Sequence, residues 1–162
     1  MNSYAGEWRT MNVDVSTEIV VRRPRDVVAS FASDPDHVPD WYANIESVEW
    51  KTPRPLAKGS QVAFVAHFLG RRMAYTYEIV ELVPGERLVM RTSEGPFPME
   101  TSYWWGSTAD GFTRMILRNS GRPQGFSRWV APFIAAAMRR ANRKDLAALK
   151  TLLERNAAQT IA

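Results

Sequence analysis

The chain has 162 residues and a mass of 18.4 kDa, a length that favours one domain. It is 45% hydrophobic and 23% charged, which excludes a disordered tail and a collagen-like fibre. The net charge is +4 and there is no cysteine, so disulfide bridges, thiol catalysis and zinc–thiolate sites are excluded as well.

The first part of the chain predicts one strand followed by two short helices. Val13–Val21 is rich in β-branched residues and is typical of a strand. Pro24 suits the first turn of a helix, which we expect over Arg25–Ala32. Asp34-Pro35 ends that helix and can cap a second one, which reaches about Trp41–Asn44.

Six further strands are expected in succession, separated by hairpin-length loops that contain Gly or Pro. Their predicted ranges are Ile45–Lys51, Gln61–Leu69, Arg72–Leu82, Glu86–Thr92, Met99–Trp105 and Phe112–Arg118. Because strands joined by short loops pair antiparallel, the seven strands predict a largely antiparallel meander.

The C-terminal part predicts one long helix that ends near Asn156. Its apolar stripe consists of Val130, Phe133, Ala137, Ala141, Leu149 and Leu152, widened by Ile134, Met138, Leu146 and Leu153. Pro132 should kink this helix or mark a late start. About 30 helical residues measure ~45 Å, more than the ~40 Å expected for the domain. The sheet is therefore expected to curl around the helix.

The chain is expected to be cytoplasmic and to consist of an N-terminal extension, residues 1–12, and a single domain, residues 13–158. The extension contains Glu7 and Arg9 and no apolar stretch, unlike a signal peptide. The longest near-apolar run, Trp129–Met138, is about half of what a transmembrane helix needs.

Loop length predicts which strand residues face the helix. Two-residue loops at Gly70-Arg71 and Pro84-Gly85 place apolar residues of both hairpins on one face, with Phe64 opposite Tyr77, and leave His67 on the solvent face. This inner face also carries hydroxyl groups, and an apolar pocket with a few polar groups is typical of a small-molecule site. The alternative is that the aromatic side chains simply fill the interior.

The residues expected to contact a ligand follow from this assignment of faces. From the sheet they are Phe64, Phe68, Tyr75, Tyr77, Met90, Met99, Thr101, Tyr103, Trp105 and Met115. From the long helix they are Phe133, Ala137 and Ala141, and Trp41 is expected to close one end of the cavity.

No motif indicates a metal site, a cofactor or a catalytic centre. His37 and His67 are far apart in the sequence, and no cluster of histidines and carboxylates has ligand spacing. There is no glycine-rich dinucleotide loop and no phosphate loop. We therefore expect no metal and no cofactor, and whether the chain is an enzyme stays open at this point.

Most of the excess positive charge lies between Phe126 and Asn156. The basic residues there are Arg128, Arg139, Arg140, Arg143, Lys144, Lys150 and Arg155, against Asp145 and Glu154. The first interpretation is a solvated helix face, and the alternative is a weak contact with an anionic surface. Nucleic acid is not expected, because the cations are not interleaved with aromatic residues.

Several motifs, taken in order, resemble a known family. Arg23–Val28 opens the first helix, Tyr77–Glu81 is followed by Pro84–Leu88, and Gly111–Arg114 forms a turn before the last strand. With the closing helix around Asp145–Glu154, these stretches resemble the START-like (SRPBCC) superfamily, in particular its polyketide cyclase/dehydrase and lipid-transport branch.

The resemblance implies an α+β helix-grip fold, in which a seven-stranded curved antiparallel sheet wraps around the C-terminal helix and two short helices follow strand 1. It implies a deep cavity with its mouth among Leu69–Arg71, Gly95–Pro98 and Gly121–Gly125. The expected function is to bind or carry a hydrophobic small molecule such as a lipid, polyketide or aromatic metabolite, as a monomer or homodimer. The alternative is a polyketide cyclase or aromatase acting on a poly-β-ketone.

Overall fold

The computed structural model of the chain describes residues 13–122 and 130–160. The elements are β1 (Val13–Val21), α1 (Arg25–Ser33), the 3-10 helix η2 (Pro35–His37), α2 (Val38–Trp41), β2 (Ile45–Trp50), β3 (Gln61–Phe68), β4 (Arg71–Val83), β5 (Arg87–Glu94), β6 (Met99–Ser107), β7 (Thr113–Gly121) and α3 (Ala131–Thr160). The predicted extension at residues 1–12, part of the predicted mouth at residues 123–125, and Arg128 lie outside the described residues.

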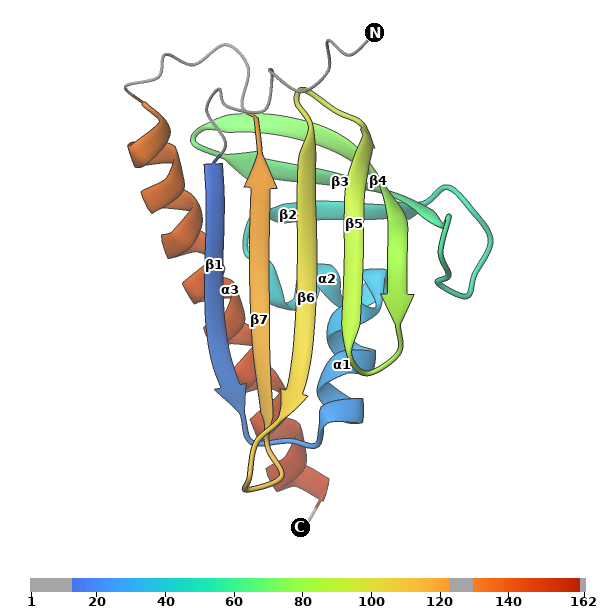
Figure 1. The fold of residues 1–162 in the computed structure, drawn as a ribbon, viewed down its shortest axis with the longest axis vertical. Coiled ribbons are helices and arrows are strands. Elements are labelled where there is room, and N and C mark those ends of the chain that lie inside the picture. The colour runs from blue at the N-terminus through green and yellow to red at the C-terminus, as the bar shows by residue number, and fades with distance from the viewer. Residues whose placement is uncertain (1–12, 123–129, 161–162) are drawn as a thin grey trace, which may run out of the picture.

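All seven strands form one antiparallel sheet in the order β1-β7-β6-β5-β4-β3-β2. Strands β2 to β7 follow chain order, and β1 joins the far edge beside β7. In Figure 1 the sheet curls so strongly that β2 and β3 cross behind the upright strands, while α3 passes along the inner side near β1. The predicted α+β fold, a curved antiparallel sheet around a long helix, is confirmed.

Local sequence explains where the helices begin. The Asp34 carboxylate accepts a hydrogen bond from the Asp36 backbone N–H at 2.9 Å, which is the expected cap of the short helical segment. Helix α3 begins at Ala131, so Pro132 lies in its first turn, where the missing proline N–H costs no helical hydrogen bond. Of the two outcomes expected at Pro132, a kink or a late start, the structure shows the late start.

The β3–β4 hairpin keeps the predicted faces but not the predicted partners. Phe64 lies opposite Tyr75 rather than Tyr77, because the two-residue loop is Leu69-Gly70 instead of Gly70-Arg71. A shift of two residues preserves the alternation of side chains across the sheet, so both tyrosines still face inward. In the β4–β5 hairpin, the predicted pairing of Ile79 with Met90 is confirmed.

Helix α3 is anchored to the sheet near both of its ends. In its second half, Leu146 and Leu149 belong to the main hydrophobic cluster together with Met115 of β7. In its first turns, Ile134 forms a smaller cluster with Val13 of β1. The space described below lies between these two clusters, along the first half of the helix.

The loop of the β3–β4 hairpin contains a strained residue. Leu69 has a φ of 50° and is followed by Gly70 at 74°, the pattern of a type I′ turn, in which Asn is preferred to Leu at the first position. The Leu69 side chain is also 57% exposed, so packing of this side chain does not offset the strain of the left-handed backbone conformation.

We predict that Leu69→Asn stabilises the protein by about 1 kcal/mol, because Asn tolerates the left-handed conformation. Urea denaturation measures the free energy of unfolding. Leu69→Ala, which removes the exposed side chain but keeps the strain, is the control and should change stability little. Equal stability of the two variants would contradict this account of the turn.

Candidate functional site

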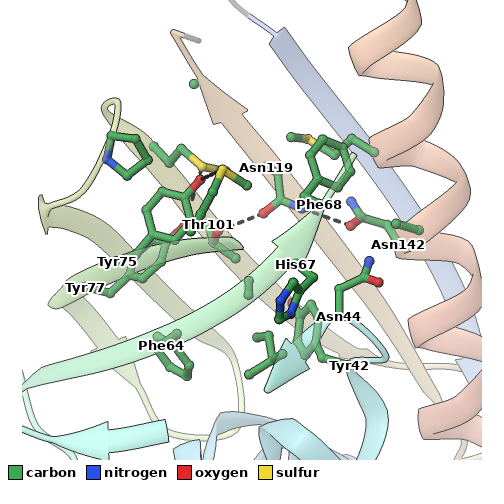
Figure 2. Close-up of a pocket in the computed structure, with 18 of the residues that line it drawn as sticks. Tyr42, Asn44, Phe64, His67, Phe68, Tyr75, Tyr77, Thr101, Asn119 and Asn142 are labelled. Atoms are coloured by element: carbon green, nitrogen blue, oxygen red, sulfur yellow. Dashed lines mark hydrogen bonds between the residues drawn. The ribbon is translucent and has the colours of Figure 1, made fainter. Parts of the chain in front are cut away.

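A cavity of about 620 Å³ lies between the inner face of the sheet and the first half of α3. This volume is within the range of small-molecule sites. Figure 2 shows side chains reaching into it from the strands on one side and from α3 on the other. Its walls are mainly apolar and aromatic, and the predicted hollow is present.

The structure places most of the predicted contact residues on the wall of this cavity. Those that line it are Phe64, Phe68, Tyr75, Tyr77, Met90, Met99, Thr101, Tyr103 and Ala141. Their contact with a ligand stays a prediction.

The other predicted contact residues lie elsewhere. Trp41, Trp105 and Met115 are buried in the hydrophobic core, and Trp105 also borders a separate open groove beside α1. Ala137 is not on the cavity wall. Phe133 is 74% exposed, which corrects its predicted position on the inner face of the helix.

The error at Phe133 has a physical reason. Over residues 131–157 of α3, the buried residues are Ile134, Asn142, Asp145, Leu146, Leu149 and Leu153. Two members of this buried face, Asn142 and Asp145, are polar, and a search for apolar residues at helical spacing passes over them. The predicted stripe is therefore rotated around the helix axis relative to the face that is buried. The interval from Met138 to Asn142 to Asp145 keeps the helical spacing, so the face could have been traced through the polar positions.

The first polar group in the cavity is a chain of hydrogen bonds that links the sheet to the helix. The Thr101 hydroxyl donates to Asn119 Oδ1 at 2.7 Å, and Asn119 Nδ2 donates to Asn142 Oδ1 at 3.1 Å. Thr101 and Asn119 lie directly opposite each other on β6 and β7. All three side chains are buried, and the dashed lines in Figure 2 follow the chain.

The second polar group lies at the end of the cavity near α2. The hydroxyls of Tyr42 and Tyr103 are 2.7 Å apart, and Asp145 Oδ1 accepts a hydrogen bond from the Ala43 backbone N–H at 3.1 Å. Burial raises the pKa of Asp145 to about 6, more than the Ala43 hydrogen bond and the Lys144 charge lower it. Burial likewise raises the pKa of both tyrosines, so they remain neutral phenols.

The β3–β4 and β5–β6 loops contribute to the wall of the cavity through Leu69, Arg71, Pro96 and Phe97. That these loops form its mouth stays a prediction from the family resemblance. The β5–β6 loop packs closely over Tyr75, since a Cβ atom at Gly95 would lie 2.7 Å from the Tyr75 ring. Any side chain at position 95 would therefore displace that ring.

Four other expectations concern the position of His67, a metal site, a membrane-spanning helix and the basic residues of α3. His67 is half exposed beside Glu46, 3.6 Å away, although it also borders the rim of the cavity. In residues 13–122 and 130–160 no group of acidic or histidine side chains could hold a metal ion. Among the described helices, none combines the length and hydropathy needed to cross a bilayer. Arg139, Arg140, Arg143 and Lys144 are exposed on α3, and their contact with an anionic surface stays a prediction.

The raised pKa of Asp145 predicts a stability that falls as the pH rises. The folded state holds the proton between the ordinary pKa near 4 and the folded value of about 6, so stability decreases across that interval. Asp145→Asn should therefore be more stable than the unmodified protein above pH 7, by as much as about 3 kcal/mol, with the difference shrinking towards pH 4. Urea denaturation at several pH values measures this.

Asp110→Asn, in the exposed β6–β7 turn, is the matched control and should follow the pH profile of the unmodified protein. A difference between Asp145→Asn and the unmodified protein that is the same at pH 4 and pH 8 would contradict the assignment.

Comparison with known proteins identifies the fold and the family of this chain. No curated protein matches the sequence. Among solved structures, a protein from Thermus thermophilus aligns with a TM-score of 0.76 at 18% identity, over 88% of this chain and 98% of its own. The Zhui aromatase/cyclase from a Streptomyces species aligns with a TM-score of 0.75 at 18% identity, over 90% and 96%.

A START superfamily protein from Mycobacterium smegmatis gives a TM-score of 0.74 at 14% identity, over 88% of this chain and 97% of its own. At these identities the likeness establishes the fold, which is the helix-grip fold of the START superfamily. The sequence model of the family described as polyketide cyclase/dehydrase and lipid transport matches residues 12–154. Since this match spans most of the 162 residues, the chain belongs to the polyketide cyclase/dehydrase and lipid transport family.

Proposed function

We propose that the protein binds and carries a hydrophobic small molecule in the cavity between the sheet and α3. The observation that supports this most directly is a space of about 620 Å³ with mainly apolar walls, left where the helix is not packed against the sheet. An empty apolar space of this size costs stability, and a ligand that fills it recovers the lost contacts.

The polar groups on the walls narrow the class of ligand. Burial raises the pKa of Tyr77 to about 12, and the other wall tyrosines are also neutral, so the tyrosines offer hydrogen bonds but no charge. The charged side chains of the wall are Asp145 and, at the β3–β4 hairpin, Arg71 and Arg72. The apolar and tyrosine-lined part of the wall suits a mainly apolar molecule with one or two uncharged polar groups. Lipids, polyketides and aromatic metabolites all meet this description.

Filling the cavity with a protein side chain tests the proposal. Ala141→Phe places a ring inside the cavity, and we expect it to weaken binding of the neutral fluorescent probe N-phenyl-1-naphthylamine at least tenfold. Ala136→Phe, on the exposed side of the same helix, is the matched control and should bind as before. Fluorescence titration gives the dissociation constants, and native mass spectrometry of the purified protein shows whether a natural ligand accompanies it.

The opposite result is equally specific. If the interior closes without a ligand, Ala141→Phe overpacks it and lowers the free energy of unfolding by about 1–3 kcal/mol. That loss, combined with unchanged probe binding, would show that the probe binds outside the cavity.

A second candidate function is ring closure in a poly-β-ketone, and the observation that favours it is Asp145. A carboxyl with a pKa of about 6 on the cavity wall is suited to exchange protons near neutral pH. As carboxylate it would accept a proton from a carbon between two ketones. That carbon would then bond to a ketone carbon further along the chain, whose oxygen takes a proton back, and loss of water would follow.

For this second candidate, Asp145→Asn should reduce turnover at least a hundredfold while leaving the affinity for N-phenyl-1-naphthylamine unchanged. The assay incubates the protein with a linear poly-β-ketone mimic and follows the absorbance of an aromatic product. Equal turnover by the variant, or no product from a mimic that binds, counts against the enzyme and leaves the carrier.

A further inference from the structure

One buried donor on the cavity wall has no partner. The hydrogen-bond chain from Thr101 through Asn119 ends at Asn142 Oδ1. The other half of that amide, Asn142 Nδ2, is buried and makes no hydrogen bond within the described residues. Leaving such a donor unpaired is costly, and most buried polar groups in proteins have a partner.

The donor-to-acceptor direction of these hydrogen bonds determines which half of the Asn142 amide remains without a partner. The Thr101 hydroxyl and the Asn119 amide are both used as donors toward the helix, so Asn142 receives a hydrogen bond and its own N–H groups remain unused. Figure 2 shows Asn142 reaching from α3 toward Asn119, with the only dashed line at its oxygen.

No acceptor of the neighbouring cavity wall forms a hydrogen bond with this amide N–H in the described residues. On α3 the nearest wall residues at helical spacing are Met138, one turn before, and Asp145, one turn after. Phe68 of β3 packs against the first-turn cluster of α3, as does Met138. On this part of the wall the donor is therefore surrounded mainly by apolar groups. A bound molecule can supply the hydrogen-bond acceptor that the protein does not.

We propose that Asn142 Nδ2 recognises an uncharged acceptor oxygen of the ligand, such as the carbonyl of a ketone or an ester. A carboxylate would also accept this hydrogen bond, but the acidic Asp145 lies on the next turn of the same face and repels an anion when ionised. Thr101 and Asn119 are then positioning residues, since their hydrogen bonds hold the Asn142 amide oxygen and leave its N–H groups to the ligand. This inference rests on the proposed ligand-binding function and specifies one part of it.

Three rigid compounds of nearly the same shape separate the possibilities. 9-Fluorenone carries a carbonyl acceptor, fluorene carries no polar group, and carbazole carries an N–H donor. The variant is Asn142→Leu, which removes the amide. The matched control is Asn44→Leu, because Asn44 also lines the cavity but takes no part in the hydrogen-bond chain.

We expect the affinity ratio of 9-fluorenone to fluorene to fall about tenfold in Asn142→Leu and to stay unchanged in Asn44→Leu. Using the ratio removes the different solvation of the two compounds from the comparison. The infrared carbonyl stretch of bound 9-fluorenone provides an independent readout. It should lie below its value in cyclohexane for the unmodified protein and Asn44→Leu, and return to that value in Asn142→Leu.

Two results would overturn the inference while leaving cavity binding in place: an unchanged ratio in Asn142→Leu, or a loss of carbazole affinity there in place of 9-fluorenone affinity. Failure of all three compounds to bind the unmodified protein and Asn44→Leu counts against the proposed function itself, and the inference falls with it. If Asn142→Leu does not fold, Asn142→Ala removes the same amide without adding bulk, and the same ratio decides.

Discussion

The structure depends on one mismatch between α3 and the curved sheet. The helix must cover the apolar inner face of the sheet, yet it packs closely only in its first turns, through Ile134, and in its second half, through Leu146 and Leu149. Between these anchors the wall residues that follow Met138 are short or polar, namely Ala141, Asn142 and Asp145. The cavity is the space that this composition leaves open, and it persists because both ends of the helix are fixed.

The polar residues Asn142 and Asp145 on this part of the helix lower the stability of the fold. Leucine at position 142 or 145 would bury more apolar area, but it would also remove the acceptor of the Asn119 amide or of the Ala43 N–H. The observed residues satisfy these two donors, while the unpaired Asn142 N–H and the desolvated Asp145 carboxyl lower the stability. Sites that trade stability in this way are commonly the functional ones, and here both residues lie on the wall of one cavity rather than at scattered positions.

The fold could be predicted from the sequence because its main constraints are local. Hairpin loops and alternating side chains determine which face of each strand is buried, and the shift of the β3–β4 pairing by two residues left Tyr75 and Tyr77 on the predicted side. The site could be predicted only in part. A count of apolar residues predicts Phe133 on the inner face and does not predict Asn142 or Asp145 there. The burial of these two residues depends on partners in β7 and in the segment after α2 that no local pattern reveals.

The two polar groups of the cavity differ in what they can do, and this difference separates carriage from catalysis. The amides of Asn119 and Asn142 do not ionise, so they can orient a bound molecule but cannot take a proton from it. Asp145 can do so, and the Ala43 N–H holds one of its oxygens in a fixed direction. A carrier needs only the first group, while ring closure needs both, because a substrate must be held in register before a proton is removed at one carbon. The presence of a titratable group beside an orienting one is therefore the feature that keeps catalysis in consideration for this cavity, beyond what its volume and apolar walls require.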